Sequence, residues 1–186
     1  DVLNGGRGLS EYHDLPSPLS PYGLQKMIGE EYCKLYTKIY GIKTASLRYF
    51  NVYGDRQSID GQYRLVMGIF ASQMLNNDPL TIVGDGEQRR DFCGVKDVVE
   101  ANILASEYLK GDVVSECFNI GNGINHSVND IAHLFGGLSV RLPERIEPKC
   151  TLSDNTKAKA LLKWKPTIKL EEWVPKWIEN ISHLSN

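Results

Sequence analysis

The chain has 186 residues, 41% of them hydrophobic, which is enough to bury one core and a small satellite of that core. Its 21 basic and 23 acidic residues are interspersed and leave a formal net charge of −2, which argues against a nucleic-acid-binding protein and a polybasic membrane anchor. No segment reaches the roughly 18 consecutive apolar residues that span a bilayer. The four widely spaced cysteines suggest neither a metal site nor a disulfide framework, and they favour a reduced, cytoplasmic protein.

The first 19 residues are expected to form the tail of a strand followed by a loop. A glycine-rich turn spans residues 4–8, and prolines interrupt the segment that follows it. The chain begins with Asp1 and an apolar pair rather than with Met. We therefore expect the sequence to start in the middle of a longer protein.

A long helix is predicted from Pro21 to about Tyr40, with Ser20 as its N-cap and Gly41 as its C-terminal stop. Tyr22 and Lys26 lie four residues apart, so they share one face of this helix. An ammonium group beside a phenol favours the ionised phenol, which suits a general acid or base. The alternative is an interfacial Tyr and a solvated Lys with no chemical role.

Residues 43–50 have the pattern of a strand that leads into a loop at residues 51–56. In open α/β sheets, ligands bind at the carboxyl ends of the strands, where this loop lies. A helix over residues 63–77 and a strand over residues 80–83 follow, and Gly84-Asp85-Gly86 is typical of a turn between two strands.

The second half continues the alternation of helices and strands. We expect a helix over 97–109 capped by Asp97, a strand over 116–120, a Ser/Asn-capped helix over 127–135, and helices near 154–163 and 170–183. This order predicts an α/β protein whose later segments form a smaller α+β lobe. Neither a glycine-rich dinucleotide-binding turn nor a P-loop occurs in the sequence.

Five motifs occur in a fixed order along the chain. They are SPYGLQK (20–26), RYFNVYGDRQ (48–57), GDGEQRRDF (84–92), FNIG (118–121) and the segment from Asp154 to Trp164-Lys165-Pro166. Together they resemble the NAD-dependent epimerase/dehydratase family of extended short-chain dehydrogenase/reductases, which act on nucleotide-diphosphate sugars and are typified by UDP-glucose 4-epimerase. The resemblance runs from Asp1 to about Trp177.

The resemblance implies that the chain is the C-terminal portion of a Rossmann-like extended short-chain dehydrogenase/reductase with a small α+β substrate-binding lobe. Residues 1–60 would complete the Rossmann-like domain, and residues 61–186 would mainly form the lobe that binds the sugar nucleotide, with 92–120 returning to the sheet. The glycine-rich NAD loop and the catalytic Ser or Thr of the family would precede Asp1.

The resemblance also implies site residues near the cofactor. Tyr22 matches the acid/base that exchanges a proton with the sugar hydroxyl, and Lys26 matches the residue that holds the nicotinamide ribose. Phe50 corresponds to a residue packed near the nicotinamide, although an ordinary core aromatic would fit the same position. The implied cofactor is NAD, and no metal ion is expected.

Other positions match the family's substrate-binding residues. Asn51 corresponds to an amide that binds the diphosphate or the sugar, and Val66 to a residue that contacts the nucleotide. Arg90 matches the arginine that clamps the diphosphate, a role suited to a planar donor; a solvated Arg89-Arg90 pair is the alternative. Arg145 and Glu147 correspond, with a spacing that departs by one residue, to the family's arginine and acid near the base and ribose.

The implied function of the parent protein is an isomerase, an NAD-dependent epimerase of nucleotide-diphosphate sugars that acts through a transient 4-keto sugar. A UDP-sugar 4-epimerase is favoured, and the fragment alone is expected to be inactive. Two alternatives stay open: a 4,6-dehydratase or reductase on the same scaffold, and a non-catalytic remnant that binds a nucleotide sugar. Family members dimerise through the helix that carries the catalytic Tyr, so a homodimer through the Tyr22 helix is expected, without nucleic-acid or membrane partners.

Overall fold

The computed structural model describes residues 8–12, 18, 20–61, 64–112, 115–145 and 147–183. The expectations for residues 1–7 and for most of 13–19 lie outside this range. The elements are, in chain order, α1 (Pro21–Tyr40), β1 (Thr44–Tyr49), β2 (Val52–Tyr53), α2 (Val66–Leu75), β3 (Leu80–Val83), β4 (Arg89–Asp91), β5 (Cys93–Gly94), α3 (Val95–Tyr108), β6 (Ser115–Ile120), β7 (Asn125–Ser127), α4 (Val128–Phe135), β8 (Ser139–Leu142), a π-helical turn η1 (Ala158–Leu162) and α5 (Leu170–His183).

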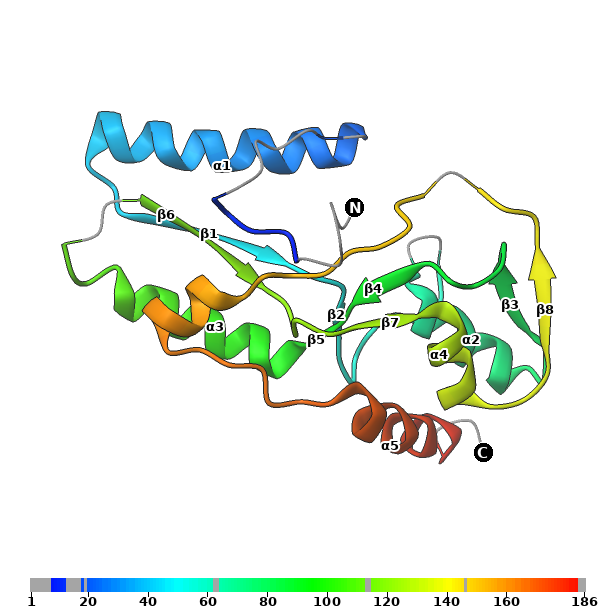
Figure 1. Cartoon of the computed structure of the whole chain (residues 1–186). Helices are drawn as coiled ribbons and strands as arrows, with labels where there is room; N and C mark the ends of the chain where they lie inside the picture. The colour runs from blue at the N-terminus through cyan, green and yellow to red at the C-terminus, as the bar shows by residue number, and fades with distance from the viewer. Residues whose placement is uncertain are drawn as a thin grey trace.

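One layered unit is built on β1 and β6, which pair in parallel with Thr44 opposite Ser115 and Tyr49 opposite Ile120. Helix α1 lies along one side of these strands and α3 along the other, as Figure 1 shows. Residues two apart on a strand share one face of the sheet, and Phe118 and Ile120 of β6 are both fully buried. They belong to a core that also contains Trp164 and the inner face of α3.

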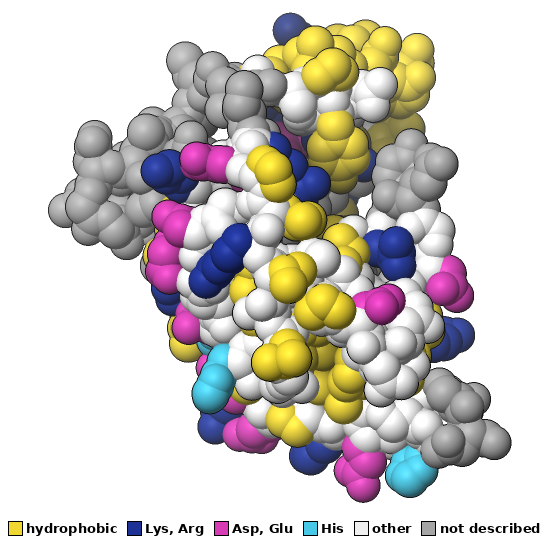
Figure 2. All heavy atoms as spheres, turned by 90° about the vertical axis from the view of Figure 1, so that its right-hand side faces the viewer, with side chains coloured by type: hydrophobic (Ala, Val, Ile, Leu, Met, Phe, Trp, Pro, Cys, Tyr) yellow, Lys and Arg dark blue, Asp and Glu magenta, His cyan; other side chains and the backbone are white. Residues whose placement is uncertain are grey.

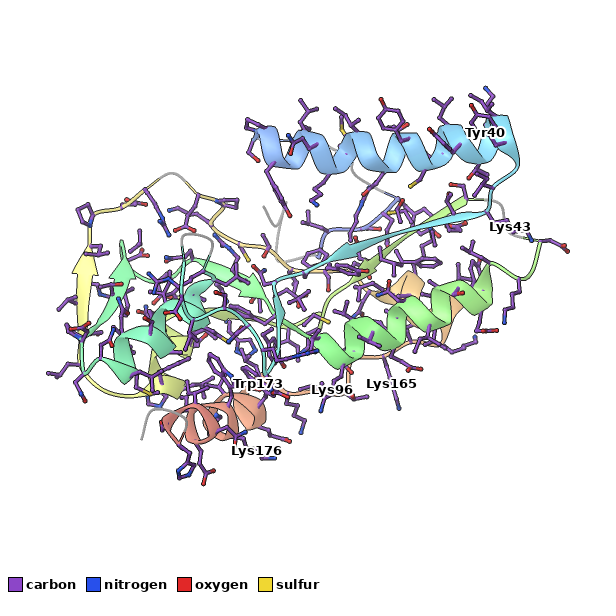
Figure 3. The ribbon with its side chains drawn as sticks, turned by 180° about the vertical axis from the view of Figure 1, so that it is seen from behind. Tyr40, Lys43, Lys96, Lys165, Trp173 and Lys176 are labelled. Atoms are coloured by element: carbon purple, nitrogen blue, oxygen red, sulfur yellow. The ribbon has the colours of Figure 1, made fainter. Side chains whose placement is uncertain are left out.

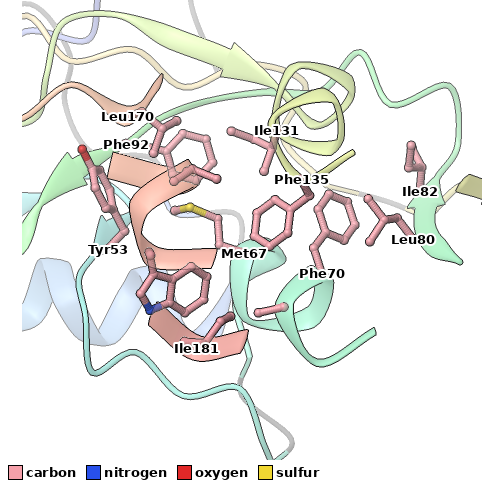
Figure 4. Packing of buried hydrophobic residues seen from close by; sticks show 13 residues of the cluster. Tyr53, Met67, Phe70, Leu80, Ile82, Phe92, Ile131, Phe135, Leu170 and Ile181 are labelled. Atoms are coloured by element: carbon pink, nitrogen blue, oxygen red, sulfur yellow. The ribbon is translucent and has the colours of Figure 1, made fainter. Parts of the chain in front are cut away.

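A second unit contains two further strand pairs, the parallel β3–β8 and the antiparallel β4–β7. Its core is rich in aromatic residues and is formed by helices α2, α4 and α5 with neighbouring strands (Figure 4). The ring of Phe135 packs edge-on against Phe70, with 5.7 Å between ring centroids, and against Trp177 at 6.2 Å. Such pairs add to the stabilisation that burial of their area provides.

Most of the predicted elements are confirmed. Helix α1 begins at Pro21, the Oγ of Ser20 accepts a hydrogen bond from the Gly23 backbone at 3.1 Å, and Gly41 ends the helix in the left-handed region with φ 69°. A strand is present at 80–83 as predicted. The α/β class is also confirmed, since parallel strands alternate with helices.

Asp97 corrects one expectation, because it does not cap α3. Gly94 is the N-cap residue of this helix, and Asp97 lies buried in its first turn. The Asp97 carboxylate accepts hydrogen bonds from the backbone of Thr167 and Ile168, both at 3.0 Å. An aspartate near a predicted helix start therefore serves a tertiary contact here, which propensity alone does not indicate.

Two further expectations change in detail. The Gly84-Asp85-Gly86 turn joins β3 to β4, but these strands pair with β8 and β7 instead of with each other. The helix expected near 154–163 is the short turn η1, which ends at Lys163 in the left-handed region with φ 57°. The residues of η1 and Trp164 pack into the core beside α3. This return of the chain to the first unit had no signal in the sequence.

Helix α1 has no buried residue, whereas α2, α3, α4 and α5 each have at least two. Its hydrophobic side chains are exposed, and they gather at the top of the molecule in Figure 2, where α1 lies. Side chains also project from the face of α1 that is turned away from the strands, Tyr40 among them (Figure 3). None of the helices in the described residues is long and apolar enough to cross a membrane.

Candidate functional site

The candidate site is a cavity of about 300 Å³ in the second unit. Its floor is apolar and includes Phe70, Phe92 and Val128. Polar and charged side chains from separate segments reach it: Asn51, Arg64, Thr81, Gln88, Arg90, Arg145 and Glu147. An apolar cavity of this size with a few convergent polar groups is the usual form of a small-molecule site.

Arg90 is held in a defined orientation at the cavity. It lies in β4, and its guanidinium donates hydrogen bonds to Oε2 of Glu147 at 2.8 Å and to the backbone oxygen of Arg89 at 2.9 Å. Its side chain is 16% exposed. The adjacent Arg89 points elsewhere, since its guanidinium donates to the side chain and backbone of Asn125. The structure therefore places Arg90, the arginine that the sequence favoured, at the cavity and directs Arg89 away from it.

Glu147 lies between two arginines. Besides its contact with Arg90, its Oε1 is 3.8 Å from Nε of Arg145, whose side chain is 68% exposed. Arg64 also lines the cavity and donates to the backbone oxygen of Ile59 at 3.2 Å. Three guanidinium groups and one carboxylate thus face the same space, an arrangement that favours an anionic ligand.

Asn51 reaches the cavity from the carboxyl end of β1. Its Nδ2 donates to the backbone oxygen of Asp91 at 2.9 Å, which fixes the amide plane next to Arg90. Val66, the first residue of α2, lines the same cavity. Five predicted substrate-binding positions (Asn51, Val66, Arg90, Arg145 and Glu147) are therefore brought together.

Sequence reasoning missed Arg64, Gln88 and Thr81. Arg64 stands just before the apolar helix α2, and a basic residue ahead of such a helix is the signal that could have drawn attention to it. Thr81 and Gln88 carry no such signal. The amide of Gln88 donates to the backbone oxygen of Val83 at 3.2 Å, so only the folded chain places it at the cavity.

Tyr22 and Lys26 form a separate group on α1. As predicted, they are one turn apart, and Nζ of Lys26 lies 5.2 Å from the centroid of the Tyr22 ring. The Tyr22 side chain is 69% exposed. Neither residue is among those that line the cavity beside Arg90. Phe50 is half-buried at the end of β1, where its backbone N–H donates to Ile120 at 3.0 Å.

The chain matches the model of the NAD dependent epimerase/dehydratase family over residues 5–121. It belongs to this family. A Methanocaldococcus jannaschii protein provisionally named UDP-glucose 4-epimerase is 42% identical over 182 residues, which cover 92% of this chain and 57% of that protein. The family membership confirms the resemblance on which the residue assignments rest, and it makes NAD the cofactor of the family.

Solved structures agree with this membership. The chain is similar to UDP-glucose 4-epimerase from Thermotoga maritima, solved with UDP-glucose, with 39% identity and a TM-score of 0.84 over 92% of this chain and 56% of that one. It is also similar to UDP-glucuronic acid 4-epimerase from Bacillus cereus, solved with UDP-glucuronic acid and NAD, with 36% identity and a TM-score of 0.82 over 94% and 57%. The chain spans about half the length of the curated relatives that it matches.

Relatives with other reactions are present too. An Escherichia coli dTDP-4-dehydro-6-deoxyglucose reductase is 30% identical over 88% of this chain and 53% of that protein. A UDP-glucuronic acid decarboxylase 1 from Xenopus tropicalis is 32% identical over 95% and 44%. Family membership therefore does not by itself determine which reaction is catalysed.

Proposed function

We propose that the chain is the UDP-sugar-binding part of an NAD-dependent UDP-sugar 4-epimerase. The observation that carries this proposal is the cavity in which Arg90 and Asn51 lie beside Glu147. A guanidinium supplies paired donors for a diphosphate, and a carboxylate accepts hydrogen bonds from ribose hydroxyls. The 4-epimerase names of the similar structures support this reaction class.

The residues present fit one edge of a cofactor site. Tyr22 and Lys26 offer a hydroxyl and an ammonium on an exposed face of α1, and the half-buried Phe50 follows the end of β1. These groups suit the ribose and nicotinamide end of NAD. The described residues contain no glycine-rich turn for the pyrophosphate. We therefore expect this chain by itself to bind NAD weakly.

The chain's own residues have distinct tasks in the proposed reaction. Tyr22 and Lys26 would hold the nicotinamide end of NAD, which would supply a reversible hydride acceptor for the sugar carbon. Tyr22 takes the proton of the sugar hydroxyl as the 4-keto sugar forms, and it gives the proton back to the epimer. Lys26, one turn along the same helix face, orients the ribose. Arg90 and Asn51 hold the diphosphate, about which the sugar turns.

Two other functions compete with this proposal. The first is a dehydratase or reductase that uses the same binding site for a different reaction on the sugar, and the similarity to the Escherichia coli reductase favours it. A binding protein without catalysis is the second, because the exposed Tyr22 lies outside the cavity. The exposed hydrophobic face of α1 supports a homodimer through this helix, to be measured by sedimentation equilibrium.

Calorimetric titration of the 186-residue chain with UDP, uridine and NAD tests the proposal. We expect UDP to bind at least about tenfold more tightly than uridine, because the diphosphate engages Arg90, and NAD to bind weakly. Incubation with NAD and UDP-glucose, followed by chromatography for UDP-galactose, tests for epimerase activity of the chain itself. Equal affinity for UDP and uridine would contradict the assigned diphosphate site.

A further inference from the structure

Asp91 lies at the junction between the segments that supply the cavity's polar groups. It is the last residue of β4, directly after Arg90, and it is fully buried. Strands β2, β4, β5 and β7 come together in this part of the molecule (Figure 1). A buried carboxylate is costly unless donors surround it, so its partners indicate what it holds in place.

The Asp91 carboxylate accepts four hydrogen bonds from two distant segments. Oδ1 accepts from the backbone N–H of Asn122 at 2.7 Å, and Oδ2 accepts from that of Gly123 at 2.9 Å. Oδ2 also accepts from the backbone N–H and the hydroxyl of Ser153, at 2.9 and 2.6 Å. Hydrogen bonds to an ionised acceptor are the strong ones, so this carboxylate fixes both segments against the end of β4.

The Asp91 backbone and the segment that contains Ser153 both lead to residues of the cavity. The backbone oxygen of Asp91 accepts from the Asn51 amide at 2.9 Å. The segment that ends at Ser153 begins at Glu147, the partner of Arg90, and it runs beside β4 through the Arg89–Cys150 bridge. The Asp91 side chain therefore fixes the segment that carries Glu147, and the Asp91 backbone oxygen fixes Asn51 next to Arg90.

The packing around the carboxylate leaves no room for adjustment. A Cβ atom at Gly121 would lie 2.4 Å from Oγ of Ser153 and 2.9 Å from Oδ2 of Asp91. A side chain there would displace the two groups that hold the junction together. Glycine at 121 is therefore a requirement of this junction.

We propose that Asp91 is a positioning residue for the diphosphate site, whose carboxylate acts through the end of β4, which carries Arg90, and through the segment that carries Glu147. The inference rests on the proposed function of the cavity. It assigns to Asp91 a specific effect on ligand affinity, separate from its contribution to stability.

Asp97 provides a matched control. It is also a buried aspartate, it accepts from the backbone of Thr167 and Ile168 at 3.0 Å, and it accepts from the hydroxyl of Thr167 at 2.7 Å. Its backbone oxygen accepts from a side chain as well, Nε1 of Trp164 at 2.8 Å. Its partners are not among the residues that line the cavity.

The test compares Asp91→Asn with Asp97→Asn in the 186-residue chain. Both variants lose an ionised acceptor, so both should melt at a lower temperature than the wild type in circular dichroism. Asp91→Asn should weaken UDP binding at least about tenfold and reduce the preference for UDP over uridine, whereas Asp97→Asn should stay within about twofold of the wild type. Equal UDP affinity in Asp91→Asn and the wild type, or an equal loss in both variants, overturns the proposal.

Milder substitutions keep the proposal testable if Asp91→Asn does not fold. Ser153→Ala and Thr167→Val each remove one hydroxyl that donates to a buried aspartate. We expect Ser153→Ala to weaken UDP binding about threefold and Thr167→Val to leave it unchanged; equal affinities overturn the proposal. If the wild-type chain fails to bind UDP, the proposed function fails and the inference with it, whereas UDP binding that is insensitive to Asp91 removes the inference alone.

Discussion

The cavity beside Arg90 and the exposed face of α1 differ in how their polar groups are held. Arg90 is mostly buried, and its guanidinium is fixed by the hydrogen bonds that it donates to the backbone of its own strand and to Glu147. Tyr22 projects from a helix that has no buried residue, and its neighbour is Lys26 of the same helix. The cavity is therefore organised by tertiary contacts, whereas Tyr22 and Lys26 are brought together by helix geometry alone.

The largest expected effect separates the two regions by stability. Phe70 is fully buried against Phe135, so Phe70→Ala should lower the free energy of unfolding by about 3–5 kcal/mol. Leu35 on α1 is 46% exposed in the single chain, so at concentrations where the chain is monomeric Leu35→Ala should lower the free energy of unfolding by less than about 0.5 kcal/mol. Urea unfolding followed by circular dichroism measures both. A loss for Leu35→Ala as large as that for Phe70→Ala would show that the outer face of α1 is packed in solution.

The next comparison concerns binding of UDP. Arg90→Ala should weaken UDP binding by at least about 1.4 kcal/mol, which is tenfold, because it removes the oriented guanidinium. Arg89→Ala is the matched control, since that guanidinium is engaged with Asn125. Tyr22→Phe should leave UDP affinity unchanged because Tyr22 does not line the cavity. Titration calorimetry measures the UDP affinity of each variant. A tenfold loss of affinity in Tyr22→Phe would mean that Tyr22 and the cavity belong to one binding site.

A third prediction concerns the attachment of α1 to the strands. Glu30 accepts two hydrogen bonds from Arg48 of β1, both at 2.7 Å, and this carboxylate raises the pKa of the Arg48 guanidinium above its ordinary value. Glu30→Gln should lower the free energy of unfolding by about 1–2 kcal/mol, because the pair is partly buried. Glu31→Gln is the control, since its pair with Lys34 is exposed and worth less than about 0.5 kcal/mol. Equal losses would mean that α1 is not anchored through Arg48.

Local signals predicted most of the fold. The Ser20 cap, Pro21 and Gly41 determined both ends of α1, because these residues act within one turn of the backbone. The pairing of β4 with β7 and the return of η1 to the first core depend on contacts between distant segments, and no local pattern encodes them. The same holds for Asp97, which a local rule assigned to a helix cap.

The candidate site divides in the same way. The family motifs identified Asn51 and Arg90, and the chain brings them together as expected. They did not identify Arg64 or the contact between Arg90 and Glu147, since these require the loop conformations around the cavity. Sequence motifs identify candidate ligand-binding residues, whereas the residues that position them can be identified only from tertiary contacts.

The smallest expected effect is a pH dependence at the start of α4, beside the cavity-lining Val128. The backbone N–H of Ser127 donates to Oδ2 of Asp130 at 2.8 Å, and this bond lowers the pKa of the Asp130 carboxyl below its ordinary value of 3.8. A lowered pKa in the folded state gives stability that is present above the ordinary value and is lost as the pH falls through the lowered one. Thermal melts of the wild type and Asp130→Asn should therefore differ at pH 6 by the stability of a partly exposed cap, at most about 1 kcal/mol, and converge as the pH falls through the lowered pKa.

Glu100→Gln on the exposed side of α3 is the control for this measurement, and its difference from the wild type should be smaller at every pH. A gap between the wild type and Asp130→Asn that widens toward low pH would mean that the protonated form of Asp130 is the stabilising one, contrary to the hydrogen bond from Ser127. Because Asp130 also lies 3.4 Å from the guanidinium of Arg89, the gap should shrink in high salt. The pH measurement thus tests a local helix cap, which the sequence predicted. The buried junction at Asp91 depends on contacts between distant segments, and the sequence did not predict it.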